Sequence, residues 1–328
     1  MAWQVKSRNG IWLPQIDWWL DAHKPAPRSV ISHAHADHVA RHGEAICTPA
    51  TAALIEARSG KPKSPPRTIE FDCPISLTPT ATLTLVPAGH VLGSAQALIS
   101  HPEYGRLLYT GDFKLRPSGT AETCATPAAD VLIMETTFAR SHYVFPPAET
   151  VFRDVIAFCR ETLAQGEIPV LLGYSLGRSQ EILHGLSDAD LPLMLHPMVE
   201  KVTRVYESHD VTFPAYTSFA PMFAPGHVII TPAQALKGEL FSAVGPIRTA
   251  VLTGWAIDTA TRYRHACDAA FPLSDHAGYE DLLEFVRRVN PRRVYTVHGF
   301  ADEFAATLRQ RGIDAWALGR NNQLELTF

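Results

Sequence analysis

Short apolar runs in the first 140 residues predict a series of β-strands. The segments Arg28–Ser32, Thr82–Val86, Arg106–Thr110 and Asp130–Met134 each have strand-type composition and end at a turn or a polar residue. A helix is expected over Thr48–Ala57, which carries a proline near its start. The ends of these strands are where we look for a functional site, because histidine and acidic side chains follow several of them.

The pattern changes near residue 148, where helices begin to alternate with strands. The expected elements are helix Glu149–Gln165, strand Ile168–Leu172, helix Leu176–Gly185, strand Leu191–Leu195 and helix Met198–Ser208. After about residue 271 we expect helix Tyr279–Val289, strand Arg293–Val297, helix Ala301–Arg311 and strand Gln323–Thr327. Together these patterns predict an α/β protein.

Composition and charge exclude several classes of protein. A chain of 328 residues corresponds to about two domains, and its 46% hydrophobic content is too high for a disordered chain, a coiled coil or a collagen-like fibre. The net charge of −4 gives no overall attraction for nucleic acid, although a local basic groove is still compatible with it. The basic stretch over residues 59–67 is either a solvated linker or a substrate contact.

Cysteine usage and the distribution of apolar residues predict a cytoplasmic protein. The five cysteines are scattered and form no C-x-x-C pair, which argues against a disulfide scaffold and fits a reducing compartment. The N-terminus lacks the apolar core of a signal peptide. The longest uncharged stretch, Val211–Leu236, contains four prolines, so we expect no membrane helix and no membrane partner.

A dense group of ligand-type side chains follows the first predicted strand. His33, His35, Asp37 and His38 lie within six residues. On a continuing strand, His33 and His35 would point to one face, and a turn would direct Asp37 and His38 to a second point. Imidazole nitrogens and carboxylate oxygens are ligands that zinc prefers. The sequence therefore predicts a metal centre here.

Two more candidate ligands follow later strands. His90 lies in a turn flanked by Gly89 and Gly93, and Asp112 comes two residues after a strand. Each residue alone is more typical of a cap or another structural polar group, but beside the first cluster each becomes a candidate ligand. A carboxylate such as that of Asp112 can place one oxygen on each of two cations.

The order of these motifs resembles the metallo-β-lactamase superfamily. Three later motifs, Glu135–Phe138, Ser274–Ala277 and Val297–Gly299, resemble its β-CASP nuclease branch, as does the stretch Gly173–Gln180. The residues of these motifs are most similar to those of bacterial DNA-ligase-associated exonucleases, which resemble Artemis and the crosslink-repair nucleases. The resemblance implies an αββα metallo-β-lactamase sandwich over residues 1–142 and 271–328, with an α/β β-CASP domain inserted at residues 143–270.

The resemblance also implies a role for each motif residue. It implies two Zn²⁺ ions, with Mn²⁺ or another divalent metal as the alternative. The first ion would be held by His33, His35 and His90, and the second by Asp37, His38 and His298. Asp112 would bridge the two ions. The resemblance makes Asp37, Asp112, Glu135 and His276 catalytic. Glu135 would orient His276, which would act as the general acid for the departing 3′ oxygen.

Two residues are implied as contacts for the substrate phosphate. Arg178 opens a helix after a turn, and a guanidinium at a helix N-terminus is suited to bind an anion. The structural alternative for Arg178 is a salt bridge between the domains. Ser274 would add a hydrogen bond to the phosphate.

The function implied by the resemblance is a metal-dependent phosphodiesterase that uses a hydroxide activated by two zinc ions. It would act on DNA as a 5′→3′ exonuclease in DNA repair, and a DNA ligase or helicase would be its protein partner. A β-CASP ribonuclease in RNA processing is the alternative, because the Artemis branch usually has an apolar residue where this chain has His298. Polarity, strand preference, the physiological metal and the oligomeric state stay open.

Two further alternatives come from other classes of hydrolase. A small-molecule metallo-hydrolase would keep the metal ligands but leave the inserted domain and the later motifs without a role. The stretch Gly173–Gly177 matches the G-x-S-x-G pattern of serine hydrolases, with Ser175 as nucleophile. That interpretation leaves the histidine and aspartate cluster unexplained.

Overall fold

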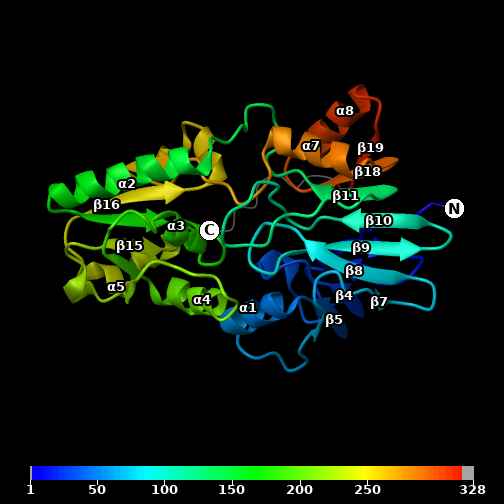
Figure 1. Cartoon of the computed structure of the whole chain (residues 1–328), viewed down its shortest axis with the longest axis horizontal. Coiled ribbons are helices and arrows are strands. Elements are labelled where there is room, and N and C mark those ends of the chain that lie inside the picture. The colour runs from blue at the N-terminus through cyan, green and yellow to red at the C-terminus, as the bar shows by residue number, and fades with distance from the viewer. Residues whose placement is uncertain (1, 320–328) are drawn as a thin grey trace. The chain divides into compact units, whose positions relative to one another are not determined.

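The computed structural model describes residues 2–319, which form two compact units (Figure 1). Residues 2–142 and 276–319 build the first unit, and residues 143–275 build the second. The expected strand Gln323–Thr327 lies outside the described residues. Within residues 2–319, no helix has both the length and the apolar character needed to cross a membrane.

The first sheet of the first unit has six strands in sequence order. They are β1 (Lys6–Ser7), β2 (Ile11–Leu13), β3 (Trp18–Leu20), β4 (Arg28–Val30), β5 (Glu44–Cys47) and β6 (Arg67–Thr68). Strands β3 to β6 are parallel neighbours. Helix α1 (Pro49–Ser59) connects β5 to β6; it begins there because the Thr48 side chain accepts a hydrogen bond from the Thr51 amide and Pro49 takes the first helical position.

The second sheet joins two distant parts of the chain. Its order is β19-β18-β11-β10-β9-β8-β7, formed by β7 (Ile75–Ser76), β8 (Thr82–Pro87), β9 (Ala95–His101), β10 (Gly105–Tyr109), β11 (Val131–Glu135), β18 (Arg293–Val297) and β19 (Asp314–Ala317). Strands β8 and β10 both pair antiparallel with β9, while β11 and β18 continue parallel to β10. Strands β8, β10, β11 and β18 therefore run in one direction, and their carboxyl ends share one edge.

Alternating side chains along these strands build two cores. Leu83, Leu85 and Ile99 face the first sheet and pack with residues such as Leu13 and Leu20. The intervening residues face the helices α7 (Tyr279–Val289) and α8 (Ala301–Gln310) in a second core that includes Leu98, Leu108, Phe285 and Phe304. Because its inner face is covered, the first sheet must carry the crossover helix α1 on its outer face. The layer order is αββα, and the predicted α/β class is confirmed.

The second unit is built on a six-stranded sheet in which every pairing is parallel. Its order is β14-β13-β15-β12-β16-β17, formed by β12 (Ile168–Leu172), β13 (Leu193–Leu195), β14 (Thr217–Ser218), β15 (Val228–Thr231), β16 (Ile247–Leu252) and β17 (Ala269–Phe271). The helices are α2 (Ala148–Ala164), α3 (Arg178–Gly185), α4 (Pro197–Glu207), α5 (Glu239–Ser242) and α6 (Thr261–Arg264). Helix α3 begins at Arg178 rather than at the expected Leu176, because the preceding Gly177 has a positive φ of 88°.

Candidate metal centre

Ligand-type side chains occupy the carboxyl ends of several strands in the first unit. His33–His38 follow β4, His90 follows β8, Asp112 follows β10, Glu135 is the last residue of β11, and His298 follows β18 directly. Since β8, β10, β11 and β18 run in the same direction, His90, Asp112, Glu135 and His298 follow strand ends at one edge of the second sheet. The segment His33–His38 reaches them from β4 of the first sheet. The topology thereby gathers residues that are far apart in the sequence.

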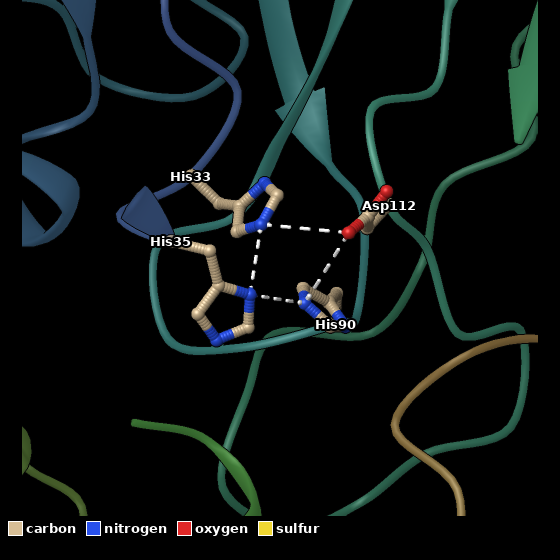
Figure 2. Close-up of side chains that lie close together, drawn as sticks. All are labelled: His33, His35, His90 and Asp112. Carbon is tan, nitrogen blue, oxygen red and sulfur yellow. Dashed lines mark hydrogen bonds and ion pairs between the residues drawn. The ribbon is translucent and has the colours of Figure 1, made fainter. Parts of the chain in front are cut away.

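Four of these side chains direct donor atoms toward one another (Figure 2). The Nδ1 atom of His35 lies 3.0 Å from Nε2 of His33 and 3.1 Å from Nε2 of His90. Oδ2 of Asp112 lies 3.6 Å from the same nitrogen of His33 and 3.9 Å from that of His90. Tetrahedral zinc with ligand bonds of about 2.0–2.1 Å keeps its donors roughly 3.3 Å apart. The donor set and its convergence fit a divalent metal ion.

The local backbone of this cluster differs from the prediction. The sequence pattern places His33 and His35 on a continuing strand, but β4 ends at Val30, and a 3₁₀ turn covers Ala36–His38. The two rings converge because the chain bends, and they present different nitrogens, Nε2 of His33 and Nδ1 of His35. The expectation of a shared strand face is therefore wrong, although the two side chains do lie together.

A second group of donors lies beside the first and shares Asp112 with it. Nε2 of His38 is 3.5 Å from Oδ2 of Asp37 and 3.5 Å from Oδ2 of Asp112. The ring of His298 lies 5.9 Å from that of His38. Oδ2 of Asp112 thus lies within 3.9 Å of nitrogens of His33, His90 and His38, so this carboxylate borders both groups of donors.

Burial and mutual charge set the protonation of this cluster. Burial, reinforced by the neighbouring histidines, lowers the pKa of His33 well below its usual value, so this ring keeps a free lone pair. Burial raises the pKa of Asp112 to about 7 despite the opposing charges of His38 and His276. Burial disfavours charged His38, but Asp112 and Asp21 outweigh it and raise the pKa of His38 to about 10. A bound cation would stabilise the lone pair of His33 and the ionised carboxylate of Asp112.

Asp21 is a candidate functional residue that the sequence patterns did not indicate. It follows β3 with a left-handed φ of 48°, and its Oδ2 accepts hydrogen bonds from Nδ1 of His38 (2.8 Å), the Tyr109 hydroxyl (2.8 Å) and the Ser32 hydroxyl (2.5 Å). A carboxylate on the second nitrogen of a metal-ligating histidine orients the ring. An acidic residue directly after the strand Trp18–Leu20 is the same signal that identified Asp112, and it could have found Asp21.

Glu135 and His276 form a pair next to the metal-ligand cluster. Nδ1 of His276 lies 2.8 Å from Oε1 of Glu135, and the ring of His276 lies 4.6 Å from that of His90. The main-chain amides of Phe113 and Thr137 also donate to the Glu135 carboxylate. Burial disfavours the ionised carboxylate, but the charge and hydrogen bond of His276 lower the pKa of Glu135 to about 2. An ionised Glu135 accepts a hydrogen bond from Nδ1 of His276 and so fixes the orientation of this ring.

The two predicted phosphate contacts belong to the second unit, where the structure gives Arg178 other partners. Arg178 is 3% exposed and donates to the carboxylate of Asp275 and to the main-chain carbonyls of Leu252 and Leu273. Ser274 is buried in the segment next to Asp275. This arrangement supports the structural alternative for Arg178, a salt bridge, which here lies within the second unit. None of these contacts of Arg178 points to phosphate binding.

The serine hydrolase alternative finds no support around Ser175. Helix α3 starts three residues after this serine, and the positive φ of the turn falls on Gly177 rather than on Ser175. Asp275, one residue that could supply the acid of a triad, is paired with Arg178. The residues of the first unit therefore remain the best candidate for chemistry.

Comparisons with known proteins give one matching family and several relatives. A family described as "Zn-dependent metallo-hydrolase RNA specificity domain" matches residues 269–318, which include His276 and His298. The chain is 54% identical over 326 residues to a probable DNA ligase of Opitutus terrae, covering 99% of this chain and 32% of that protein.

Two more distant relatives are named as nucleases. The 5′ exonuclease Apollo of Rattus norvegicus is 26% identical, covering 88% of this chain and 55% of that protein. The probable RNase MJ4 of Methanocaldococcus jannaschii is 25% identical, covering 71% of this chain and 64% of that protein. The chain thus spans from about a third to just under two thirds of the length of these three relatives.

A solved structure supports the fold alone. A protein of unknown function from Enterococcus faecalis V583 superimposes with a TM-score of 0.60 at 11% identity, covering 90% of this chain and 80% of that one. The matched domain, the named relatives and the arrangement of histidines and aspartates point to one group of enzymes. The chain belongs to the metallo-β-lactamase/β-CASP nuclease family of Zn-dependent metallo-hydrolases.

Proposed function

We propose that this chain is a divalent-metal-dependent phosphodiesterase that degrades DNA, as a 5′→3′ exonuclease in cytoplasmic DNA repair. The observation that carries the proposal is the convergence of His33, His35, His90 and Asp112 on one point, with the Glu135–His276 pair beside it. Hydrolysis of a phosphodiester needs an activated water, neutralised phosphate charge and a proton for the leaving oxygen. The two adjacent groups of side chains suit these needs.

The proposed ligand set holds two ions that share Asp112. His33, His35 and His90 would hold the first, and Asp37, His38 and His298 would complete the second. Zn²⁺ is our first choice because the donors are imidazoles and carboxylates, and Mn²⁺ is the second. When bound, such ions would supply Lewis-acid activation of water and charge neutralisation at the phosphate.

The side chains of the protein have their own tasks in this proposal. Glu135 holds the imidazole of His276 through Nδ1, so that a proton on Nε2 can pass to the departing 3′ oxygen. Asp112 keeps the two ligand groups together, and Asp37, whose side chain is 78% exposed, marks the side open to substrate.

The relatives supply the support for DNA and also for the alternative substrate. The high identity to a probable DNA ligase and the likeness to the 5′ exonuclease Apollo favour DNA, and the former suggests a DNA ligase as functional partner. A ribonuclease is the second candidate, favoured by the RNA-specificity domain that spans His298 and by the likeness to RNase MJ4.

We assign the two units to the expected domains, with the second boundary after residue 275 rather than after residue 270. We assign the first unit to the metallo-β-lactamase domain, because the αββα layers and the donor cluster lie within it. The second unit, with its parallel sheet, is then the β-CASP domain.

Cleavage of matched oligonucleotides tests the proposal. End-labelled single-stranded DNA and RNA of one sequence, each with a 5′-phosphate or a 5′-hydroxyl, are incubated with zinc- or manganese-loaded protein. The control is Asp112→Asn, which keeps the shape of the side chain and removes the charge shared by the two ligand groups. We expect stepwise loss of DNA from a 5′-phosphate and none with the variant.

Other outcomes would redirect or end the proposal. Preferential cleavage of RNA would move the protein to RNA processing. No cleavage of either polymer by the metal-loaded protein would refute the nuclease proposal and favour a small-molecule metallo-hydrolase. Equal activity of Asp112→Asn would show that the cleavage does not come from this site.

A further inference from the structure

The three histidines proposed for the first ion come from two sheets of the first unit. His33 and His35 follow β4 of the first sheet, whereas His90 lies in the turn between β8 and β9 of the second sheet (Figure 2). Nδ1 of His35 lies 3.1 Å from Nε2 of His90. One ion can use all three rings only if the two segments are held at a fixed separation, which the surrounding groups must supply.

The start of helix α1 holds the turn that carries His90. The hydroxyl groups of Thr48 and Thr51 both donate hydrogen bonds to the main-chain carbonyl oxygen of Gly93, at 2.7 and 3.0 Å. Both threonines are buried. A carbonyl oxygen has two lone pairs, so two hydroxyl donors satisfy it fully and fix the direction in which it points. The turn is therefore tied to a helix that belongs to the first sheet.

Gly93 packs directly against the first turn of α1, and the bonds inside its turn transmit this contact to His90. A Cβ on Gly93 would lie 2.6 Å from the Cβ of Ala50 and 2.8 Å from Oγ1 of Thr48, so a side chain there would push the turn away. The next residue, Ser94, accepts a hydrogen bond from the main-chain amide of His90 at its hydroxyl oxygen (3.1 Å). A shift of Gly93 would therefore displace the backbone of His90.

The last turn of the same helix reaches the other ligand segment. The Arg58 guanidinium donates a hydrogen bond to the main-chain carbonyl oxygen of Ala34, which lies between His33 and His35 in the sequence. A hydrogen bond from a charged donor is stronger than one between neutral groups. Arg58 comes seven residues after Thr51, a spacing that places both on one face of a helix. One face of α1 thus contacts both segments that carry the three histidines.

We infer that helix α1 positions the three histidine ligands of the first proposed ion, with Thr51 and Arg58 as its positioning residues. Thr51 holds the turn of His90, and Arg58 holds the segment from His33 to His35. Groups that orient ligands without touching the ion commonly change metal affinity by about 10- to 100-fold. The inference rests on the metal site of the proposed function, and it does not depend on whether the substrate is DNA or RNA.

Metal binding without substrate tests the inference. Zn²⁺ affinity is measured by competition with a chromophoric chelator, and the visible absorption of Co²⁺-loaded protein reports the coordination geometry. Thr51→Val keeps the shape of the side chain and removes the hydroxyl, Thr51→Ser retains the hydroxyl, and Arg58→Met removes the guanidinium. Thr162→Val is the matched control, because Thr162 is also buried and its hydroxyl donates to the Phe158 carbonyl oxygen (2.8 Å) within α2 of the second unit.

We expect Thr51→Val and Arg58→Met each to bind Zn²⁺ about 10- to 100-fold more weakly and to alter the Co²⁺ absorption. Thr51→Ser and Thr162→Val should match the unaltered protein in both measurements. Unchanged affinity of Thr51→Val and Arg58→Met would overturn the inference, and so would an equal loss in Thr162→Val. Should Thr51→Val fail to fold, Arg58→Met decides the matter alone, because this exposed side chain at the end of α1 can be replaced without disturbing the core.

Cleavage assays on the unaltered protein separate this inference from the proposed function. If the protein binds Zn²⁺ but cuts neither DNA nor RNA, the nuclease proposal fails, and the expected losses of affinity would still support the role of α1. If the protein cuts an oligonucleotide and both variants bind Zn²⁺ normally, only the inference about α1 fails. A protein that bound no divalent ion would refute both.

Discussion

The hydroxyl of Thr136 holds the backbone of His298, because it donates hydrogen bonds to the main-chain carbonyl oxygens of both Val297 (3.1 Å) and His298. His298 has a left-handed φ of 56°, which few residues other than glycine adopt. The following Gly299 also has a φ of 56°, and a Cβ there would lie 2.5 Å from the Thr136 carbonyl oxygen. Thr136 therefore sets the direction in which the proposed ligand His298 leaves the end of β18.

Replacing Thr136 by valine should weaken metal binding while the shape of the side chain is kept. The variant leaves two carbonyl groups without their donor and frees the backbone of His298. We expect about 10- to 100-fold lower affinity for the more weakly held ion, as for other groups that orient ligands. Titration against a competing chelator measures this affinity. Thr136→Ser retains the hydroxyl and should behave as the unaltered protein, whereas equal affinities of all three proteins would contradict the prediction.

Asp21→Asn should lower metal affinity by orienting His38 less firmly. Asparagine tolerates the left-handed backbone of this position, so the change removes charge rather than shape. We again expect about a 10- to 100-fold loss, measured by metal content after dialysis. Tyr109→Phe is the matched control, because it removes one hydrogen bond to the same carboxylate and leaves the contact with His38. A larger effect of Tyr109→Phe than of Asp21→Asn would argue against the role of Asp21.

Removing the guanidinium of Arg178 should destabilise the second unit. Arg178→Met removes the guanidinium that pairs with the buried carboxylate of Asp275, and breaking a buried pair costs about 3–5 kcal/mol. Urea unfolding followed by circular dichroism measures the loss, and the double variant Arg178→Met/Asp275→Leu should recover part of it. A single variant with normal stability but lost affinity for a 5′-phosphate would instead favour the original expectation of phosphate binding.

The unfolding free energy of the metal-free protein should fall in acid partly through Glu135. Its pKa is lowered in the folded state to about 2 from 4.5, since the contacts with His276 outweigh burial. A carboxylate with a depressed folded pKa contributes stability above its unfolded pKa and loses it as the pH falls from about 4.5 toward 2. Urea unfolding across this range tests the point. Glu135→Gln should make the unfolding free energy depend less on pH in this range. The same pH dependence in both proteins would disprove the contribution of Glu135.

Removal of divalent metal should lower the midpoint of thermal unfolding, and added zinc should restore it. An ion that binds only the folded state stabilises it by about 2.7 kcal/mol when present at 100 times its dissociation constant. Differential scanning calorimetry with and without chelator measures the shift. Asp112→Asn should show a smaller response to zinc, whereas the same response in both proteins would place the bound ion elsewhere.

The sequence by itself predicted the α/β class, six of the eight α-helices and seven of the nineteen strands of the described chain. These elements could be predicted because strand and helix periodicity depends on neighbours a few positions away. The resemblance of their motifs to a known family grouped His33, His35, His90 and Asp112, because local spacing does not link residues so far apart. Helix Tyr279–Val289 and strand Arg293–Val297 have their predicted bounds, since caps and apolar spacing mark both ends.

Only the tertiary structure decided which nitrogen each histidine presents and which groups orient the ligands. The contacts of Asp21 with His38, of Thr136 with His298 and of Arg178 with Asp275 join residues separated by 17, 162 and 97 positions. Such contacts depend on how distant strands and loops pack, and the spacing of residues along the sequence does not determine that packing. A buried Arg178 and an anion-binding Arg178 have the same local sequence, and the packing around the guanidinium distinguishes them.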